Sequence, residues 1–395
     1  MDTTISALSE LQELLRSSQH NSAASKKVFV GFDGFVDKIK RAVMEKQNTR
    51  TLYFDSIRDF ANRILLACGK SGQIQMDTQR VKFGGNAPIL ADTLGRLGIQ
   101  TYCLGSMGYP QLHQVFSGMN PRSETISVLN PGQSDAIEFS DGKLIFSELE
   151  VFDQYTWEYI IKIAGIEAIH KAISDSTLIA FVDWANLPHA SNIWEGMLED
   201  IIKPSKRKDY LFFFDLCDPS KKTTEQIDEV LDLVSSFSCY GKVTLGLNEN
   251  ETLKIYAALR GIDYITDSPG LPPVKQAGDS LYKSMNIDAL LVHPVDRCIL
   301  FHQHEANELN GRLVLKPKVL TGGGDNLNAG YCLGMLLGFS SAQCMLLGMA
   351  VSGAYVENGF SADLQGILQY LDIWMAELLQ KNELSRQHVF AHRHE

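Results

Sequence analysis

Short apolar runs alternate with helical stretches along most of this chain, and that alternation restricts the folds it can adopt. The runs lie at residues 27–32, 101–104, 178–182, 211–216, 242–247 and 289–293. Each has the length of a buried strand, and most are separated by segments with a helical spacing of apolar residues. Repeated strand–helix–strand units build a mainly parallel sheet. The sequence therefore predicts an α/β fold with one main domain, because no Pro-, Gly- or Ser-rich linker divides the chain.

A hairpin is predicted at residues 136–146, outside this alternation. Two runs of β-forming residues flank Ser140-Asp141-Gly142, a sequence typical of tight turns. Residues 74–83 alternate loosely, and we expect another strand there; a short strand is also expected at 313–315. The main domain is assigned to residues 27–380, preceded by an N-terminal helix and linker (1–26) and followed by a C-terminal tail (381–395).

The charge and hydropathy of the chain exclude several classes of protein. Its 395 residues carry a formal net charge of −11, which argues against a broadly basic surface for nucleic acid. No apolar run reaches the ~18 residues of a membrane-spanning helix, and the N-terminus lacks the pattern of a secretory signal. The seven cysteines are scattered and never spaced C-x-x-C. We therefore expect a cytoplasmic protein with reduced thiols that binds neither nucleic acid nor membrane.

Three consecutive glycines, Gly322, Gly323 and Gly324, stand directly before Asp325 at the start of a predicted helix. Glycines adopt backbone dihedrals closed to other residues and let N–H groups approach a ligand closely. The helix N-terminus adds unpaired N–H groups and a partial positive charge, so this turn suits a phosphate. A carboxylate beside such an anion hole could accept the proton of an attacking hydroxyl. The alternative is an ordinary tight turn in which Asp325 only caps the helix.

Two stretches early in the chain place polar residues where α/β sheets bind ligands. Asp33 and Asp37 follow the first predicted strand, and carboxylates at that position could accept hydrogen bonds from a polyol. Gly84-Gly85-Asn86 opens a predicted helix. Each stretch also has a purely structural interpretation, with the aspartates as turn residues and Asn86 as a helix N-cap.

Asn248 and Glu251 lie three residues apart where a predicted strand passes into a helix. An amide and a carboxylate at that point could hold Mg²⁺, partly through water. The same spacing also suits a helix-capping arrangement. The residues alone leave both interpretations open.

Taken together and in their order along the chain, the four stretches resemble the signatures of the ribokinase-like superfamily, which includes the PfkB carbohydrate kinases. Gly322–Asp325 is similar to its G-A-G-D signature, and Asn248-x-x-Glu251 matches its N-x-x-E motif. Gly84–Asn86 with the helix after it is similar to the glycine-pair signature, and Asp37 falls near the sugar-binding aspartate. Residues 215–223 are similar to the family's D-x-N/S segment. The chain is identified as a divergent member.

The resemblance implies a three-layer αβα sandwich with a mainly parallel central sheet and a small β-strand lid from segments near 38–46, 74–83 and 133–150. It implies that Asp325 is the catalytic base and that Gly322, Gly323 and Gly324 form the anion hole. The sugar would be held by Asp37, Gly84, Gly85, Asn86 and, more weakly, Asp33. The nucleotide and Mg²⁺ would be held by Asn248, Glu251, His293 and Asn328, with the metal bound through Asn248 and Glu251.

The implied function is transfer of the γ-phosphate of ATP to a hydroxyl of a sugar or sugar-like polyol, with Mg²⁺ as cofactor. Lid strands that pair between subunits in this family would allow a homodimer. The alternatives are a non-catalytic sugar or nucleotide sensor, a kinase of a nucleoside or vitamin-type alcohol, and ADP as donor, since GFDGFVD resembles the ADP-dependent sugar kinases.

The chain departs from the family pattern at three positions. Val319 stands where an aspartate is usual, which leaves the dependence on a monovalent cation open. Val295 and Cys298 stand where PfkB members often carry nucleotide-loop glycines. A differently shaped nucleotide pocket is therefore expected.

Overall fold

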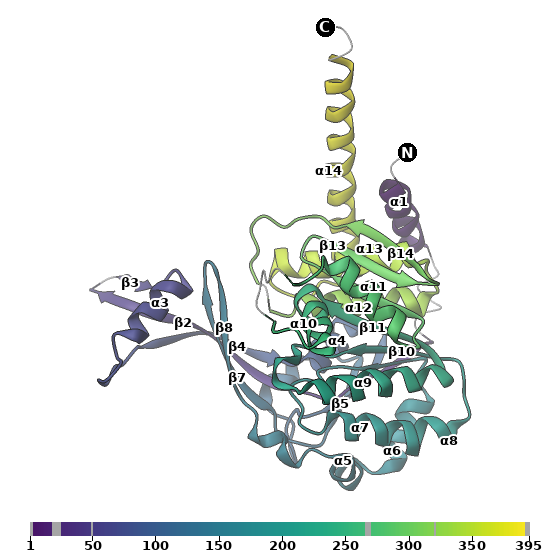
Figure 1. Ribbon diagram of the computed structural model, residues 1–395, viewed down its shortest axis with the longest axis horizontal. Helices are drawn as coiled ribbons and strands as arrows, with labels where there is room; N and C mark the ends of the chain where they lie inside the picture. Colours follow the sequence, from purple (N-terminus) through teal and green to yellow (C-terminus); the bar gives the residue numbers. More distant parts are fainter. Residues whose placement is uncertain (1–2, 18–24, 49, 265–269, 320, 392–395) are drawn as a thin grey trace.

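The computed structural model describes residues 3–17, 25–48, 50–264, 270–319 and 321–391, which contain two β-sheets (Figure 1). The larger, central sheet has nine strands in the order β14-β13-β12-β11-β10-β9-β1-β5-β6. From β6 to β12 every neighbouring pair is parallel, and β13 and β14 add an antiparallel edge. The strands are β1 (Lys27–Gly31), β5 (Gln100–Gly105), β6 (Ser123–Ser127), β9 (Leu178–Phe181), β10 (Tyr210–Asp215), β11 (Gly241–Asn248), β12 (Ala289–His293), β13 (Arg297–His302) and β14 (Glu305–Asn310).

Helices cover both faces of the central sheet because its strands are apolar on both sides. In β1, Phe29 joins the hydrophobic cluster on one face, whereas Val28 and Val30 join the cluster on the other. A strand between two apolar layers requires this alternation. One layer contains α1 (Thr3–Arg16), α4 (Asn86–Arg96), α12 (Gly323–Leu337), α13 (Ser341–Asn358) and α14 (Leu364–Ala391); the other contains α5 (Trp157–Ala164), α6 (Ile166–Ser174), α7 (Ala190–Gly196), α9 (Thr224–Ser236), α10 (Glu249–Arg260) and α11 (Val274–Ser284). The predicted three-layer αβα sandwich is confirmed.

The second sheet has five strands and projects to one side of the sandwich (Figure 1). Its strands are β2 (Phe35–Gln47), β3 (Arg50–Tyr53), β4 (Met76–Gly84), β7 (Gly132–Phe139) and β8 (Gly142–Glu148). β7 and β8 form the expected hairpin, with Phe139 opposite Gly142. Helix α3 (Ile57–Leu65) packs on this sheet, and Phe54 and Phe60 belong to a small core of its own. We call it the small sheet.

Several segments differ from the sequence-based expectations. β13 and β14 form a hairpin where no strands were expected, and residues 313–315 are not a strand. Helix α14 continues to Ala391, so residues 381–391 are helical and project from the body instead of forming an irregular tail (Figure 1). Residues 18–24 of the expected linker and 392–395 of the tail lie outside the described ranges. Within those ranges, no helix is long and apolar enough to cross a membrane.

Candidate active site

The expected site residues gather at one edge of the central sheet, where the parallel strands end. Asp33 follows β1, Asp215 ends β10, Asn248 ends β11 and His293 ends β12. From β1 the chain builds outward in both directions, to β5 and β6 on one side and to β9 through β12 on the other. Such a reversal opens a crevice beyond the carboxyl ends of the strands, where open α/β sheets bind ligands.

The N-terminus of α12 lines a cavity at this edge and carries no side-chain cap. Gly322 has a φ of +94°, in the left-handed region, and a Cβ at this position would lie 2.9 Å from Tyr355 Oη. Tyr355 Oη donates a hydrogen bond to Thr321 O at 2.7 Å, which holds the residue before the turn. Uncapped N–H groups and the helix dipole together make an anion-binding site.

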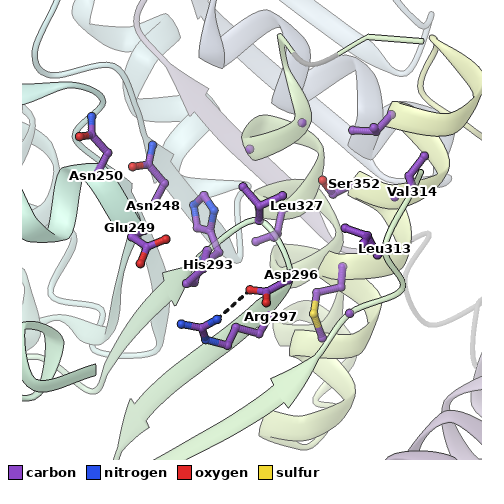
Figure 2. A pocket seen from close by; sticks show the side chains of 18 of the residues that line it. Asn248, Glu249, Asn250, His293, Asp296, Arg297, Leu313, Val314, Leu327 and Ser352 are labelled. Atoms are coloured by element: carbon purple, nitrogen blue, oxygen red, sulfur yellow. Dashed lines mark hydrogen bonds and ion pairs between the residues drawn. The ribbon is translucent and has the colours of Figure 1, made fainter. Parts of the chain in front are cut away.

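The cavity beside this turn has a volume of about 880 Å³. Figure 2 shows Asn248 and His293 on one side of it and Leu313 and Val314 on the other, with the Asp296–Arg297 ion pair between. Its apolar walls come from α10, α12, α13, the turn between β12 and β13, and the loops before α11 and α12: Leu253, Leu271, Pro294, Val295, Leu313, Val314, Pro317, Leu327, Met349 and Val356. The cavity therefore suits a ligand with one apolar part and one anionic end.

Asp325 lies in the first turn of α12, directly after the glycines. Burial raises the pKa of its carboxyl well above the usual range, and the carboxylates of Asp215 and Asp33 raise it further, whereas Lys82 opposes the shift. A carboxylate with a raised pKa is a stronger proton acceptor than an ordinary one. The expected base thus lies beside the expected anion hole.

His293 lies across from the glycine turn. Its Cε1 would be 3.7 Å from a Cβ placed on Gly324, so the ring adjoins the first turn of α12. Burial lowers the pKa of His293 to about 4. The imidazole is therefore neutral near pH 7 and can offer a hydrogen bond without adding charge.

Asn248 and Glu251 form a reciprocal capping box at the start of α10. Asn248 Oδ1 accepts from the Glu251 N–H, and Glu251 Oε2 accepts from the Asn248 N–H, both at 2.9 Å. Burial raises the pKa of Glu251 to about 8, and Asp215 adds to the shift. The capping interpretation is therefore correct for these side chains, although Asn248 also lines the cavity.

The donor set at this edge fits a magnesium ion that is held mainly by phosphates. Among the residues that the structure describes, no three His, Cys, Asp or Glu side chains form a metal-binding group. Mg²⁺ usually takes one or two protein carboxylates and completes its shell with water and substrate phosphate oxygens. Asp215 and Asp325 both raise the pKa of Glu251, so the three carboxyl groups lie close together at this edge and would be the protein's oxygen donors to such a shell.

Asn328, expected to contact the nucleotide, lies in the interior beside Asp215, and its contact with the nucleotide stays a prediction. It is fully buried, and its Nδ2 donates to Asp215 Oδ2 at 2.6 Å. Asp215 Oδ1 also accepts from the Cys217 N–H at 2.9 Å. Asn328 is not among the residues lining the cavity. Asn328 lies one turn further along α12 than Asp325, and its hydrogen bond orients the Asp215 carboxylate.

The glycine pair of the second stretch makes room for two carboxylates. A Cβ on Gly84 would lie 2.2 Å from Asp37 Oδ2, and one on Gly85 would lie 2.7 Å from Asp33 Oδ2. Gly85 also has a φ of +94°. Neither position tolerates a larger residue, so the pair is explained by packing around the aspartates as much as by contact with a ligand.

Asp33 and Asp37 differ in their surroundings. Asp33 is fully buried, and its two oxygens accept from the backbone N–H groups of Asn86 and Ala87, each at 2.7 Å. Through these contacts Asp33 satisfies the first N–H groups of α4 from outside the helix. Its expected contact with a sugar stays a prediction. Asp37 is 7% exposed and lies opposite Lys82 in the β2–β4 pair. Asn86 is partly exposed and remains a candidate contact.

Four further residues of this region were missed in the sequence. Asp183 follows β9, has a φ of +60°, and has a pKa raised to about 6 by burial. Its position after an apolar run was the signal that could have found it. Lys82, Lys143 and Tyr355 reach the site from the small sheet and from α13, and no local pattern marks them.

Comparison with known proteins identifies the family of the chain. A family model described as prokaryotic ketohexokinase matches residues 2–374. A ketohexokinase of Haloferax volcanii is 22% identical over 381 residues, covering 94% of this chain and 98% of that protein.

Solved structures with this fold include three sugar or nucleoside kinases. A carbohydrate kinase from Agrobacterium tumefaciens has a TM-score of 0.58 at 17% identity, covering 88% of this chain and 97% of that one. Ribokinase from Arabidopsis thaliana, complexed with ribose and ATP, has a TM-score of 0.57 at 16% identity, covering 88% of this chain and 98% of that one. Adenosine kinase from Sinorhizobium meliloti has a TM-score of 0.60 at 15% identity, covering 88% of this chain and 98% of that one. The fold is therefore that of ribokinase-like kinases, and the chain belongs to the prokaryotic ketohexokinase family, as a sugar kinase with phosphotransferase activity.

Proposed function

We propose that the protein transfers the γ-phosphate of ATP to a hydroxyl of a ketohexose. The observation that carries the proposal is the uncapped N-terminus of α12, which lines a cavity of about 880 Å³ and has Asp325 in its first turn. The family and the curated Haloferax volcanii relative, both described as ketohexokinase, support the choice of acceptor.

In the proposed reaction, the acceptor oxygen forms a bond to the γ-phosphorus while the bond from that phosphorus to the β,γ-bridging oxygen breaks. The acceptor's proton passes to Asp325. The N–H groups of Gly323, Gly324 and Asp325 face the charge on the transferred group, as donors at an uncapped helix end can. ADP leaves with the electron pair of the broken bond.

Magnesium, when bound with the nucleotide, would neutralise part of the charge on the phosphates. Asn248 and Glu251 are proposed to orient water molecules of its shell, since their capping contacts fix them at the end of β11. His293, neutral at physiological pH, would adjoin the phosphates from the end of β12. The apolar walls formed by Leu313, Val314 and their neighbours would take the adenine.

The acceptor is proposed to lie between the glycine turn and the base of the small sheet. Asp37 would accept hydrogen bonds from sugar hydroxyls, with Asn86 and the backbone of Gly84 and Gly85 beside it. The small sheet would act as a lid that excludes water and so limits hydrolysis of the nucleotide.

The test is a phosphotransfer assay with ATP or ADP, Mg²⁺, and a panel of a ketohexose, an aldohexose, a pentose and a nucleoside. We expect stoichiometric ADP and sugar phosphate from ATP and the ketohexose. Binding of sugar and nucleotide without turnover would instead support a sensor, and turnover with the nucleoside alone would replace the acceptor class.

A further inference from the structure

Two lysines of the small sheet reach the residue that precedes the glycine turn. Lys143 of β8 donates from Nζ to Thr321 Oγ1 at 2.7 Å. Lys82 of β4 donates to Tyr355 Oη at 3.3 Å, and that hydroxyl donates to Thr321 O at 2.7 Å. Thr321 is therefore held at its hydroxyl and at its carbonyl by contacts that begin in two different strands of the small sheet.

Both ammonium groups are largely buried, a position that is costly unless opposite charges surround it. Burial lowers the pKa of Lys82 and of Lys143, and nearby carboxylates oppose the shift. The other charged groups that face the pair are Asp37 of β2, Arg80 of β4, Glu138 of β7 and Asp325 of α12. Lys82 thus adjoins the expected acceptor-binding carboxylate, Asp37. Through Tyr355 and Thr321 it is also connected to the glycine turn.

These contacts are not shared by every lysine of the small sheet. Lys40 of β2 pairs with Asp135 of the neighbouring β7, so its ion pair stays within that sheet. Lys82 and Lys143 instead cross from the small sheet to the sandwich. Lys40 therefore provides a matched control for removal of a lysine from the same sheet.

We propose that Lys82 and Lys143 tie the small sheet to the turn at Gly322, so that acceptor binding beneath the sheet positions the anion hole for phosphoryl transfer. This inference rests on the proposed function. Both lysines are positioning residues, because they act through Thr321 and Tyr355. Since Gly322 follows Thr321 directly, loss of either contact frees the peptide that opens the turn, and misplacement by about 1 Å can cost ~10²-fold in rate.

The experiment is a double-mutant cycle on Lys143 and Thr321 in the full chain, with kcat and KM measured for ATP and the acceptor. Lys143→Met lowers kcat about tenfold and leaves the KM for ATP within about twofold, since the contact shapes the transition state more than the ground state. Thr321→Val, which removes the hydroxyl and keeps the shape, gives a similar loss, whereas Thr321→Ser restores most of the rate. The double variant loses no more than either single variant, because both remove one contact.

Additive losses in the double variant, about a hundredfold in total, would overturn the proposal. So would a Lys143→Met variant indistinguishable from Lys40→Met, which is expected to stay within about twofold of the parent. The activity of the parent protein tests the proposed function separately. If the parent transfers no phosphate, the proposed function fails before any lysine variant is compared.

A second cycle uses Lys82→Met with Tyr355→Phe and keeps the test decisive if a Lys143 variant does not fold. Tyr355→Phe retains the ring and removes only the hydroxyl that relays Lys82 to Thr321. The two losses again do not add. Additive losses here, in variants that unfold at the parental temperature, would show that Lys82 does not act through Tyr355 and would overturn the proposal.

Discussion

The Asp33 carboxylate caps the helix that begins at Asn86: its Oδ2 accepts from the Asn86 N–H at 2.7 Å. The neighbouring Ala87 N–H donates to Oδ1 at the same distance. The residue at the N-cap position itself, Gly85, has no side chain to do this. A carboxylate from the end of β1 therefore fixes the start of α4, while Asp37, four residues later, stays beside the proposed acceptor site.

This division of labour predicts opposite results for two similar substitutions. Asp33→Asn leaves one oxygen to serve two N–H groups, so we expect the free energy of unfolding to fall by about 1–3 kcal/mol. Asp37→Asn should raise the KM for the acceptor, which Asp33→Asn leaves unchanged, although it also removes a carboxylate that faces the buried Lys82. Denaturant unfolding and steady-state kinetics on both variants check this. A stable Asp33→Asn variant with a raised acceptor KM would place Asp33 at the sugar site.

The glycine turn predicts a position-dependent cost for alanine within one helix. Gly322 and Gly338 flank α12 with φ values of +94° and +72°, but only Gly322 would meet another group, Tyr355 Oη at 2.9 Å. Gly338→Ala should cost about 1–2 kcal/mol of stability through backbone strain and leave kcat unchanged. Gly322→Ala should lower kcat at least tenfold in addition, because it displaces the anion hole. Equal kcat values in the two variants would argue against a phosphate role for the turn.

Glu251 predicts a measurable dependence of stability on pH in the absence of nucleotide and Mg²⁺. Its pKa is about 8 in the folded protein, against an ordinary value of 4.5. Between these pH values the folded protein retains a proton that the unfolded chain has released, so the free energy of unfolding falls as pH rises, by at most about 1.4 kcal/mol per pH unit.

Glu251→Gln isolates that contribution, because glutamine keeps an oxygen for the Asn248 N–H but cannot titrate. We expect its stability to fall less steeply than that of the parent between pH 4.5 and 8. Other buried carboxylates, such as Asp183, titrate in both proteins and cancel in the comparison. Parallel pH profiles would show that Glu251 is not the group responsible.

The raised pKa of Asp325 predicts where activity is lost in acid. A protonated base cannot accept the acceptor's proton, so kcat/KM should fall as pH drops through the raised pKa, above the ordinary 3.8 of an aspartate. Lys82 lowers the pKa of Asp325, so Lys82→Met should move this acidic limb to higher pH. The pH–rate profiles of both proteins provide the measurement. If the acidic limb does not move, the charge of Lys82 does not affect the pKa of Asp325.

The sheet and the glycine turn could be predicted because local patterns encode them. Buried parallel strands are continuous apolar runs, as in Leu178–Phe181, and a helix start after consecutive glycines is visible in the letters, whereas the absence of a side-chain cap came from the structure. The edge strand β14 could not be found in this way. Its residues, Glu305–Asn310, are nearly all exposed, so no apolar periodicity marks them.

The roles of individual polar residues depend on partners far away in the chain. Asn248 and Glu251 could be read as ligands or as caps, and the hydrogen bonds show the caps. Lys143 bonds Thr321 across 178 positions, and Asn328 bonds Asp215 across 113. Such contacts arise from the packing of the small sheet and of α12 against the central sheet, which no short motif records.

The most direct test of the central claim is single-turnover transfer from ATP to the ketohexose by the parent and by Asp325→Asn, with nucleotide binding measured by calorimetry on both. We predict transfer by the parent, a loss of about 10²–10⁴-fold in the variant, and ATP affinity that differs little, because the amide keeps the shape but cannot take the proton. Transfer by Asp325→Asn at the parental rate would contradict the assignment of Asp325 as the base.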